Sequence, residues 1–392
     1  MNYKRINNFK EAFEIKINLL VTGINVDLDD TKISFKKKVD ALYSHTPYNY
    51  DKIPQEIILY HDENTKLPIV CNIRFNKKSP YRVFLKDNIL LLKYEDNLYI
   101  IEPTRIGNLY DYQFSESIQI LGVNLAGIVL SNYCHFVHDN KKCRFCEIDS
   151  NCFNVKAKSR VEILKHFKKI KTKKDIKYLS ITSGNFNKDY DKMLVFFIDF
   201  IKEIKFINKD IKILLSLMPP SDDELLIKLK NVGCDMVAFN IEMLERKRFE
   251  KMVPGKNLLG YDLYVEKLKK AKSIFGAGNV YSNFVYGVQS LIKNRGDTFN
   301  GKEENDISLK GVKFLLKNGI IPLYTVYHTN GTNEIGDINI NIEKLINFSL
   351  DYGRLVLKSN LVDKDKKGVL FDLGSISNHV YNDAYILNKY YL

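Results

Sequence analysis

Residues 126–146, AGIVLSNYCHFVHDNKKCRFC, join a short apolar run to three closely spaced cysteines. The run at 126–131 is rich in small and branched apolar residues between polar neighbours, which favours a buried strand. Cys134, Cys143 and Cys146 follow it with the spacing C-x8-C-x2-C. In parallel α/β folds, functional groups gather on the loops after the carboxyl ends of strands. The stretch therefore predicts a metal site at the mouth of a parallel sheet.

The same change from a short β-branched run to an amphipathic segment recurs down the chain. Six strands are expected, at Ala126–Ser131, Tyr178–Thr182, Ile211–Leu217, Met236–Ile241, Val280–Tyr286 and Ile320–Tyr327. Helices are expected between them at 159–170, 189–205, 221–231, 261–274 and 306–318, with apolar residues at helical spacing. Six βα units are too few for a closed eight-stranded barrel. The predicted fold class is α/β, a partial (βα)6 TIM-like barrel.

The chain is expected to divide into three parts. Residues 1–115 predict an accessory, β-rich module with a helical start and strands near 55–61, 67–75, 81–84, 89–94 and 98–101. Asp96 and Asn97 are expected to form a hairpin turn between the last two strands, because both residue types tolerate a positive φ. Residues 116–335 form the barrel core. Residues 336–392 close the chain, and from about 353 they predict an irregular segment that is a candidate lid.

Composition narrows the class of protein. The chain has 392 residues, of which 45% are hydrophobic, and a formal charge of +13. Its lysines are spread among acids rather than gathered, which favours a solvated surface over a nucleic-acid interface. No run is long and apolar enough to span a membrane, and the N-terminus is a poor signal peptide. Six cysteines in so long a chain do not make a disulfide framework. A cytoplasmic location follows as the expectation.

Two kinds of metal site agree with the cysteine spacing. Three thiolates leave one iron of a [4Fe-4S] cluster without a protein ligand, so that it can bind a small molecule. Cys134, His138, Cys143 and Cys146 could instead hold zinc in a Cys3His site, which would fit a non-enzymatic protein. The position after the first strand of a βα series favours the cluster. His135 and His138 are then loop residues at the barrel mouth.

With its first gap lengthened by five residues, the motif resembles the C-x3-C-x2-C of radical S-adenosylmethionine enzymes. That resemblance implies a single [4Fe-4S] cluster that cleaves S-adenosylmethionine reductively. It also implies a 5′-deoxyadenosyl radical that takes hydrogen from a substrate, and an oxygen-sensitive protein. Cys143-Arg-Phe-Cys146 keeps the family's aromatic residue before the last cysteine, which implies that Phe145 packs beside the adenine.

Other segments carry the resemblance further and imply cosubstrate contacts. Ser183, Gly184 and Asn185 follow the second strand, where the family's glycine-rich turn binds the methionine amino group. Asn240 and Glu242 alternate on the fourth strand and should share one face. With Arg246 as carboxylate partner, they are similar to the biotin synthase and lipoyl synthase branch. Gly287 and Tyr327, at the ends of the fifth and sixth strands, are the remaining candidates.

The other cysteines bear on the reaction. Only Cys71, Cys152 and Cys234 remain, without the close pairs that usually hold a second cluster. This favours hydrogen abstraction from a small molecule with rearrangement, elimination, cyclisation or carbon–carbon bond formation. An external flavodoxin or ferredoxin would supply the electron. The alternative is modification of a peptide, tRNA or carrier protein that the N-terminal module recognises. Catalytic residues beyond these are not predicted.

Overall fold

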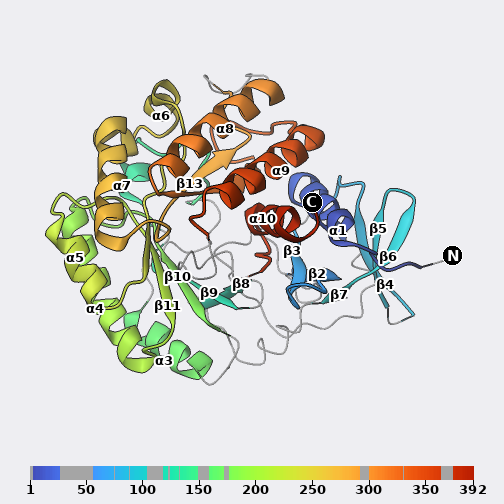
Figure 1. Cartoon of the computed structure of the whole chain (residues 1–392), viewed down its shortest axis with the longest axis horizontal. Helices are drawn as coiled ribbons and strands as arrows, with labels where there is room; N and C mark the ends of the chain where they lie inside the picture. Colours follow the sequence, from blue (N-terminus) through green and yellow to red (C-terminus); the bar gives the residue numbers. More distant parts are fainter. Residues whose placement is uncertain are drawn as a thin grey trace.

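The structure is a computed structural model that describes residues 3–26, 56–74, 76–87, 89–103, 118–121, 124–131, 133–148, 159–171, 176–291, 300–329, 331–362 and 374–392. A seven-stranded sheet forms its centre, in the order β14-β13-β12-β11-β10-β9-β8 (Figure 1). Its strands are β8 (Ile118–Leu121), β9 (Leu125–Val129), β10 (Tyr178–Thr182), β11 (Lys212–Ser216), β12 (Met236–Ala238), β13 (Val280–Tyr286) and β14 (Ile321–Val326).

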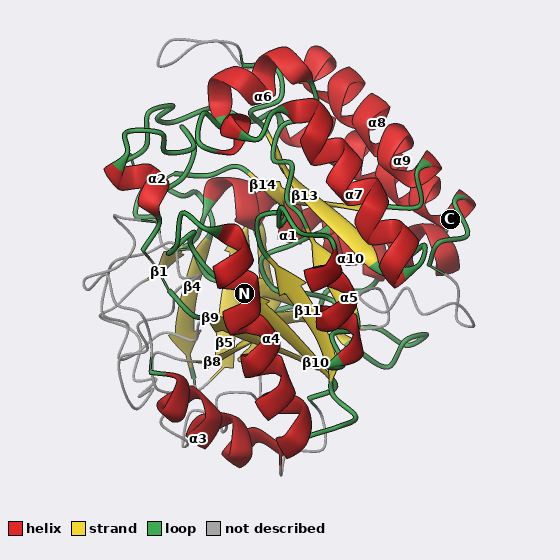
Figure 2. Ribbon diagram, turned by 90° about the vertical axis from the view of Figure 1, so that its left-hand side faces the viewer, coloured by secondary structure: helices red, strands yellow, loops and turns green. Residues whose placement is uncertain are grey.

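Strands β9 to β14 are all parallel and neighbour one another in chain order. Helices follow the strands and cover the outer face of the curled sheet, as Figures 1 and 2 show. They are α3 (Arg160–Lys171), α4 (Tyr190–Ile207), α5 (Glu224–Asn231), α7 (Tyr261–Phe275), α8 (Gly301–Lys317) and α9 (Ile342–Lys358). The expected partial (βα)6 barrel is confirmed, and the limits of β10 and β13 match the predicted ones. β12 is shorter than predicted, since it ends at Ala238.

One strand of this sheet was not expected. β8 pairs antiparallel with β9, so that Ile118 lies opposite Ile128. Its residues, Ile-Gln-Ile-Leu, favour a strand, but a run of four is too short to be a strong signal. The strand satisfies backbone groups along the edge of β9 that would otherwise be exposed.

The N-terminal part contains helix α1 (Phe9–Thr22) and two small sheets. One has the order β1-β4-β5-β6 and the other β3-β2-β7. Their strands are β1 (Asn25–Val26), β2 (Glu56–His61), β3 (Pro68–Asn72), β4 (Arg82–Lys86), β5 (Ile89–Tyr94), β6 (Asn97–Ile100) and β7 (Glu102–Pro103). The β-rich character is confirmed, but the hairpin turn is one residue earlier than predicted. Asn97 pairs with Tyr94 inside the ladder, and Glu95 takes the positive φ of 53°.

The sequence predicted an irregular closing segment, and over Tyr381–Tyr390 this prediction is wrong. These residues form helix α10, which packs against α9. A Cβ on Gly353 would lie 2.3 Å from the carbonyl oxygen of Ala384, so the two helices touch at backbone level. Many Asn and Tyr residues give α10 weak intrinsic helix propensity, and tertiary packing overrides it. No helix of the described ranges is long and apolar enough to cross a membrane.

Candidate active site

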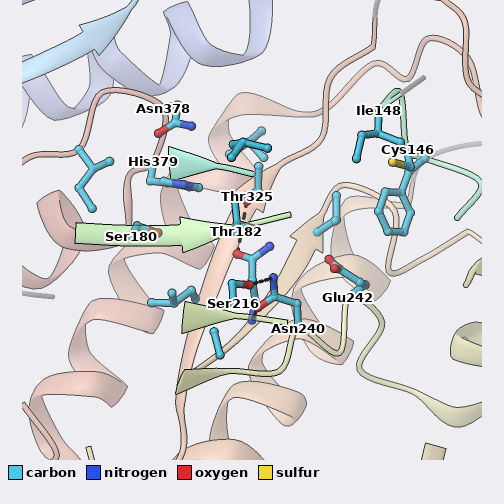
Figure 3. A pocket seen from close by; sticks show the side chains of 18 of the residues that line it. Cys146, Ile148, Ser180, Thr182, Ser216, Asn240, Glu242, Thr325, Asn378 and His379 are labelled. Carbon is cyan, nitrogen blue, oxygen red and sulfur yellow. Dashed lines mark hydrogen bonds between the residues drawn. The ribbon is translucent and has the colours of Figure 1, made fainter. Parts of the chain in front are cut away.

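A cavity of about 450 Å³ occupies the concave face of the half-barrel. All six parallel strands contribute to its wall, because alternate residues of each strand point inward. Figure 3 shows side chains of this wall. The strand residues that line it are Leu125, Val129, Ser180, Thr182, Leu214, Ser216, Ala238, Asn283, Val285, Leu323, Thr325 and Val326. The cavity therefore has an apolar wall interrupted by hydroxyl and amide groups, as in small-molecule sites.

A row of hydrogen-bonded polar groups crosses four strands of this wall. The side-chain N–H of Asn240 donates to Ser216 Oγ over 3.0 Å, and the side-chain Oδ1 of Asn240 accepts from the backbone N–H of Asn283 over 3.2 Å. Thr325 Oγ1 lies 3.3 Å from Asn283 Oδ1. These bonds fix the orientation of Asn240, one of the predicted cosubstrate contacts, before any ligand binds.

The three cysteines lie on the loop that follows β9. Cys134 is the N-cap of the single-turn helix α2 (His135–His138), which takes up much of the long gap before Cys143. Cys146 N–H donates to the carbonyl of Cys143 over 2.9 Å, so a tight turn holds the last two thiols together. All three are free cysteines of intermediate exposure. Cys146 and the predicted adenine contact Phe145 line the cavity.

The turn after β10 supports this loop. A Cβ on Gly184 would lie 2.3 Å from the carbonyl oxygen of Tyr133, so only glycine permits this approach. The Asn185 carbonyl accepts from the backbone N–H of His135 over 2.8 Å, and the Nδ1 atom of that histidine is also 2.8 Å away. Ser183 and Gly184 line the cavity. The Asn185 carbonyl binds the cysteine loop.

Helix α6 (Arg246–Met252) and the residues after it support the loop from another side. Arg144 N–H donates to the Met252 carbonyl over 3.0 Å, and Gly255 N–H donates to the Lys141 carbonyl over 2.9 Å. The buried Phe136 ring fills the space beside Gly255, where a Cβ would be only 2.4 Å from its Cγ. The lengthened gap is thus anchored by an aromatic side chain of its own.

The segment after β14 supports the loop from a third side. The Asn333 amide lies 3.2 Å from both the Phe145 carbonyl and a carboxylate oxygen of Glu147. Thr329 donates its hydroxyl to the same buried carboxylate. Tyr327 lines the cavity and donates its phenol to the Gly336 carbonyl over 2.6 Å. Its hydroxyl is therefore already bonded within the protein.

Glu242 stands at the mouth of the cavity with an unusual backbone. Its φ of 63° is rare for a residue other than glycine, and such conformations gather at functional sites. Backbone bonds to Asn283 and Val285 hold it beside β13 after β12 has ended. Its side chain accepts from Lys256 Nζ over 2.8 Å, and both side chains are largely buried. Glu242 and Asn240 do line the same cavity, as predicted.

Lys256 is a charged neighbour that the sequence did not identify. Its ammonium group also donates to the Asn240 carbonyl over 2.6 Å. Burial opposes its charge, but the carboxylate of Glu242 more than compensates and keeps the pKa of Lys256 raised. This cation also lowers the pKa of the Cys143 thiol, against the larger rise caused by burial. A positive charge therefore lies within electrostatic reach of the cysteine loop.

Three predicted residues do not reach the cavity. Arg246 is about half exposed and forms a two-pronged ion pair with Asp262 on α7. Gly287 has a φ of 106°, yet protein atoms of Ile340 and Tyr327 cover it and its N–H donates to Glu304. Asn185 binds the loop, as described. Backbone periodicity could place these residues near strand ends but could not show which side chains turn inward.

The histidines of the gap also lie away from the cavity wall. His135 is buried against Phe136 and bonds to Asn185. His138 is exposed and stacks on Tyr133 at a centroid distance of 4.7 Å. Within the described part of the chain, no group of three or more His, Cys, Asp and Glu side chains is arranged as it stands to hold a metal ion.

The donor set suits an iron–sulfur cluster better than a hard cation, because soft thiolates select iron–sulfur clusters or zinc. Burial raises the pKa of Cys146 to about 11, with the Cys134 thiol adding to the rise. The same burial raises the pKa of Cys143. Mutual influence of the thiols indicates that they are neighbours. Their protons must leave when a metal centre binds. In their chemistry the three thiols therefore suit an iron–sulfur cluster.

The C-terminal segment contributes a part of the wall that the sequence did not predict. Ile376, Asn378, His379 and Tyr381 line the cavity, and Figure 3 shows Asn378 and His379 at the opposite side from Cys146 and Glu242. No motif marks these residues. They lie about fifty residues after β14 in the sequence, so nothing local indicated that they belong to the same site.

Residues 129–287 match the family model of the radical SAM superfamily. The matched part begins at the end of β9, covers the cysteine loop and ends after β13. The chain therefore carries a radical SAM domain and is an enzyme of the S-adenosylmethionine-dependent, iron–sulfur class. Its resemblance to the biotin synthase and lipoyl synthase branch stays a prediction.

Several solved structures resemble the chain. Methylornithine synthase (PylB) has 18% sequence identity and a TM-score of 0.45, over 67% of this chain and 69% of that one. The FeFe-hydrogenase maturase HydG from Carboxydothermus hydrogenoformans has 16% identity and a TM-score of 0.45, over 60% and 52%. Coproporphyrinogen III oxidase (HemN) from Escherichia coli has 14% identity and a TM-score of 0.39, over 60% and 53%. No curated protein matches the sequence.

Proposed function

We propose that this chain binds one [4Fe-4S] cluster through Cys134, Cys143 and Cys146 and uses S-adenosylmethionine to abstract hydrogen from a small molecule. One observation carries the proposal. The loop that bears the three thiols is supported on three sides and opens, at Cys146, onto the cavity of the half-barrel. When bound, the cluster would supply the electron for reductive cleavage of S-adenosylmethionine. An intracellular, reducing compartment and an external electron donor are part of the proposal.

The residues around the mouth would hold the cosubstrate. Glu242 and Asn240 present oxygen acceptors that suit an ammonium or ribose hydroxyl group. Lys256, which is paired with Glu242, is the proposed partner of the cosubstrate carboxylate, because Arg246 is engaged by Asp262. Phe145 supplies a flat apolar face for a purine, beside the backbone of the Ser183–Gly184 turn. Two kinds of support underlie these proposed roles: the resemblance of the motifs to radical S-adenosylmethionine enzymes and the positions of the residues around the cavity.

The cavity favours a small substrate over a macromolecule. Its volume of about 450 Å³ lies within the range of small-molecule sites. Ile376, Asn378, His379 and Tyr381 of the C-terminal segment stand in its wall, with Asn378 and His379 at the end away from Cys146. Buried bonds hold the start of that segment to the N-terminal part of the chain. The N-terminal module would thus act by shaping the cavity.

The proposal is tested by anaerobic reconstitution with iron and sulfide, followed by reductant and S-adenosylmethionine. Wild-type protein is expected to give 5′-deoxyadenosine, and Cys143→Ala should lose at least nine tenths of this activity because one cluster ligand is missing. Cys234→Ala is the matched control, since this buried cysteine precedes β12 and lies outside the cavity wall. It should keep the activity. Fully loaded wild-type protein that never forms 5′-deoxyadenosine would overturn the proposal.

A further inference from the structure

Two polar atoms at the far end of the cavity have no hydrogen-bond partner in the part of the chain that the structure describes. His379 Nδ1 and Asn378 Oδ1 are covered from solvent, and neither has a hydrogen-bond partner among the described residues. Buried polar atoms in proteins are nearly always hydrogen bonded, and exceptions call for a functional explanation. Both residues belong to the cavity wall, and Figure 3 shows them at the end where Ser180 lies, away from Cys146 and Glu242. The two atoms are therefore available to a molecule in the cavity.

The surroundings of His379 decide what it can offer. Its ring bonds to the backbone carbonyl of Tyr324, and because Nδ1 is the atom without a partner, Nε2 carries the donated proton. A neutral ring with its proton on Nε2 has an accepting lone pair on Nδ1. Burial, reinforced by the charge of Lys16, lowers the pKa of His379 to about 4. The ring is therefore neutral at physiological pH.

The charged groups that the structure places beside this end, Lys16 and Asp383, are paired with each other. Lys16 Nζ bonds Asp383 over 2.6 Å, and both side chains are fully buried. The same ammonium group donates to Ser375 Oγ and to the carbonyl of Ile376. A charged ligand group would have to compete with this pair for a counter-ion, and burying it would be costly. A neutral donor would bond both acceptors without that cost.

The acceptors are also held in place before a ligand arrives. Ser377 accepts a backbone bond of 2.9 Å from Asn72 on β3, and Ser375 Oγ accepts from Val70 N–H over 3.1 Å. His379 N–H closes a turn onto the carbonyl of Ile376 over 3.1 Å. A site held this firmly loses little conformational freedom when it binds.

We propose that His379 Nδ1 and Asn378 Oδ1 form the substrate-recognition site of the cavity, and that they bind an uncharged group bearing N–H or O–H donors, such as an amide or an alcohol. That the bound molecule is the substrate rests on the proposed function. The site itself is defined by the cavity and the two acceptors alone. The cosubstrate would bind near Cys146 and Glu242 at the other end, so this end is free for the molecule that loses hydrogen.

The test uses a matched pair of probes on the full chain labelled with ¹⁵N-histidine, without cluster or cosubstrate. Acetamide carries two N–H donors, one for each acceptor, and N,N-dimethylacetamide carries none. The Nδ1 resonance of His379, assigned by its loss in His379→Phe, is expected to move saturably with acetamide. The dimethyl compound should move it less than one fifth as far. Asn378→Leu should weaken the response to acetamide about tenfold, as one good hydrogen bond is worth about 1.4 kcal/mol.

Histidine 166, on α3 and outside the cavity wall, provides the control resonance and should not respond to either probe. An equal response of His379 to both probes, or none to either, would overturn the inference. If His379→Phe fails to fold, the resonance can be assigned with His379→Gln instead. The probe test needs no cluster, so the two proposals can fail separately. If His379 responds to the probe as expected but S-adenosylmethionine is not cleaved, only the proposed function is wrong. If S-adenosylmethionine is cleaved but His379 does not respond, only this inference is wrong.

Discussion

At the scale of single residues, burial sets the charge of His379. The ring packs beside Tyr381 at a centroid distance of 5.0 Å and lies near the Lys16–Asp383 pair. Burial penalises the charged imidazolium, and the nearby ammonium group penalises it further, so the pKa falls from 6.5 to about 4. In the unfolded chain the same ring should have its ordinary pKa. Folding therefore excludes a proton from this histidine.

This shift predicts a specific loss of stability in acid. Because the folded pKa is lowered, the contribution of His379 is fully present above pH 6.5 and is lost as the pH falls toward 4. A shift of this size corresponds to up to about 3 kcal/mol. Urea unfolding of wild type between pH 7 and pH 4 should show this extra loss relative to His379→Gln. Parallel stability curves for the two proteins would contradict the assignment.

At the scale of elements, the cysteine loop is held by neighbours from three other parts of the sheet. The turn after β10, the residues after α6 and the segment after β14 each donate or accept a backbone bond with it. Phe136 within the lengthened gap occupies the space beside Gly255. The gap therefore forms a docked helical turn, and its extra residues contribute contacts that position the thiols.

Gly255→Val tests this docking. The backbone at Gly255 has a φ of −67°, so the variant is not strained, but its Cβ would overlap the Phe136 ring. Overpacking of this kind costs about 1–3 kcal/mol. Iron bound after reconstitution should fall by more than half while the far-ultraviolet circular dichroism stays unchanged.

The control for that variant is Gly260→Ala. Its φ of 83° gives backbone strain, but a Cβ there has nothing within 4 Å. Destabilisation of about 1 kcal/mol with full iron content is the expected result. If the two variants lost iron equally, general destabilisation would explain the effect and the docking role of Phe136 would be wrong.

At the scale of the whole molecule, the two ends of the chain meet behind the cavity. Lys16 of α1 reaches Asp383 of α10 and the residues just before the cavity wall. α1 also packs against α9 and α10. Figure 1 shows α1 beside α10, between the small N-terminal sheets and the barrel helices. A buried ion pair thus joins the N-terminal module to the C-terminal segment.

Replacing Lys16 by Met should destabilise the protein strongly, because it leaves the buried Asp383 without its partner. Such a loss typically costs about 3–5 kcal/mol, so the free energy of unfolding obtained from urea titration should fall by this amount. Lys10→Met, on the exposed side of the same helix, is the control and should change stability by less than about 0.5 kcal/mol. The double variant Lys16→Met with Asp383→Leu should recover most of the loss. Equal stability of the two single variants would rule out the pair as a link between the chain ends.

Much of the barrel could be predicted from local pattern. β10 and β13 have the predicted limits, because short runs rich in β-branched and aromatic residues between turn residues mark strands. The break of β12 at Ala238 could not be predicted, since Glu242 takes its positive φ from bonds to β13. α10 was missed because its helix depends on packing against α9 rather than on propensity.

The sequence by itself determined the class of this protein. Cysteine spacing after the first strand and the order of six βα units are local features, which a chain carries wherever it folds. Tertiary structure alone decided which side chains meet in the cavity. It turned Arg246 toward Asp262, placed Lys256 beside Glu242, and brought His379 and Asn378 to the far end of the wall. These outcomes depend on long-range pairing and on burial, which no local pattern encodes.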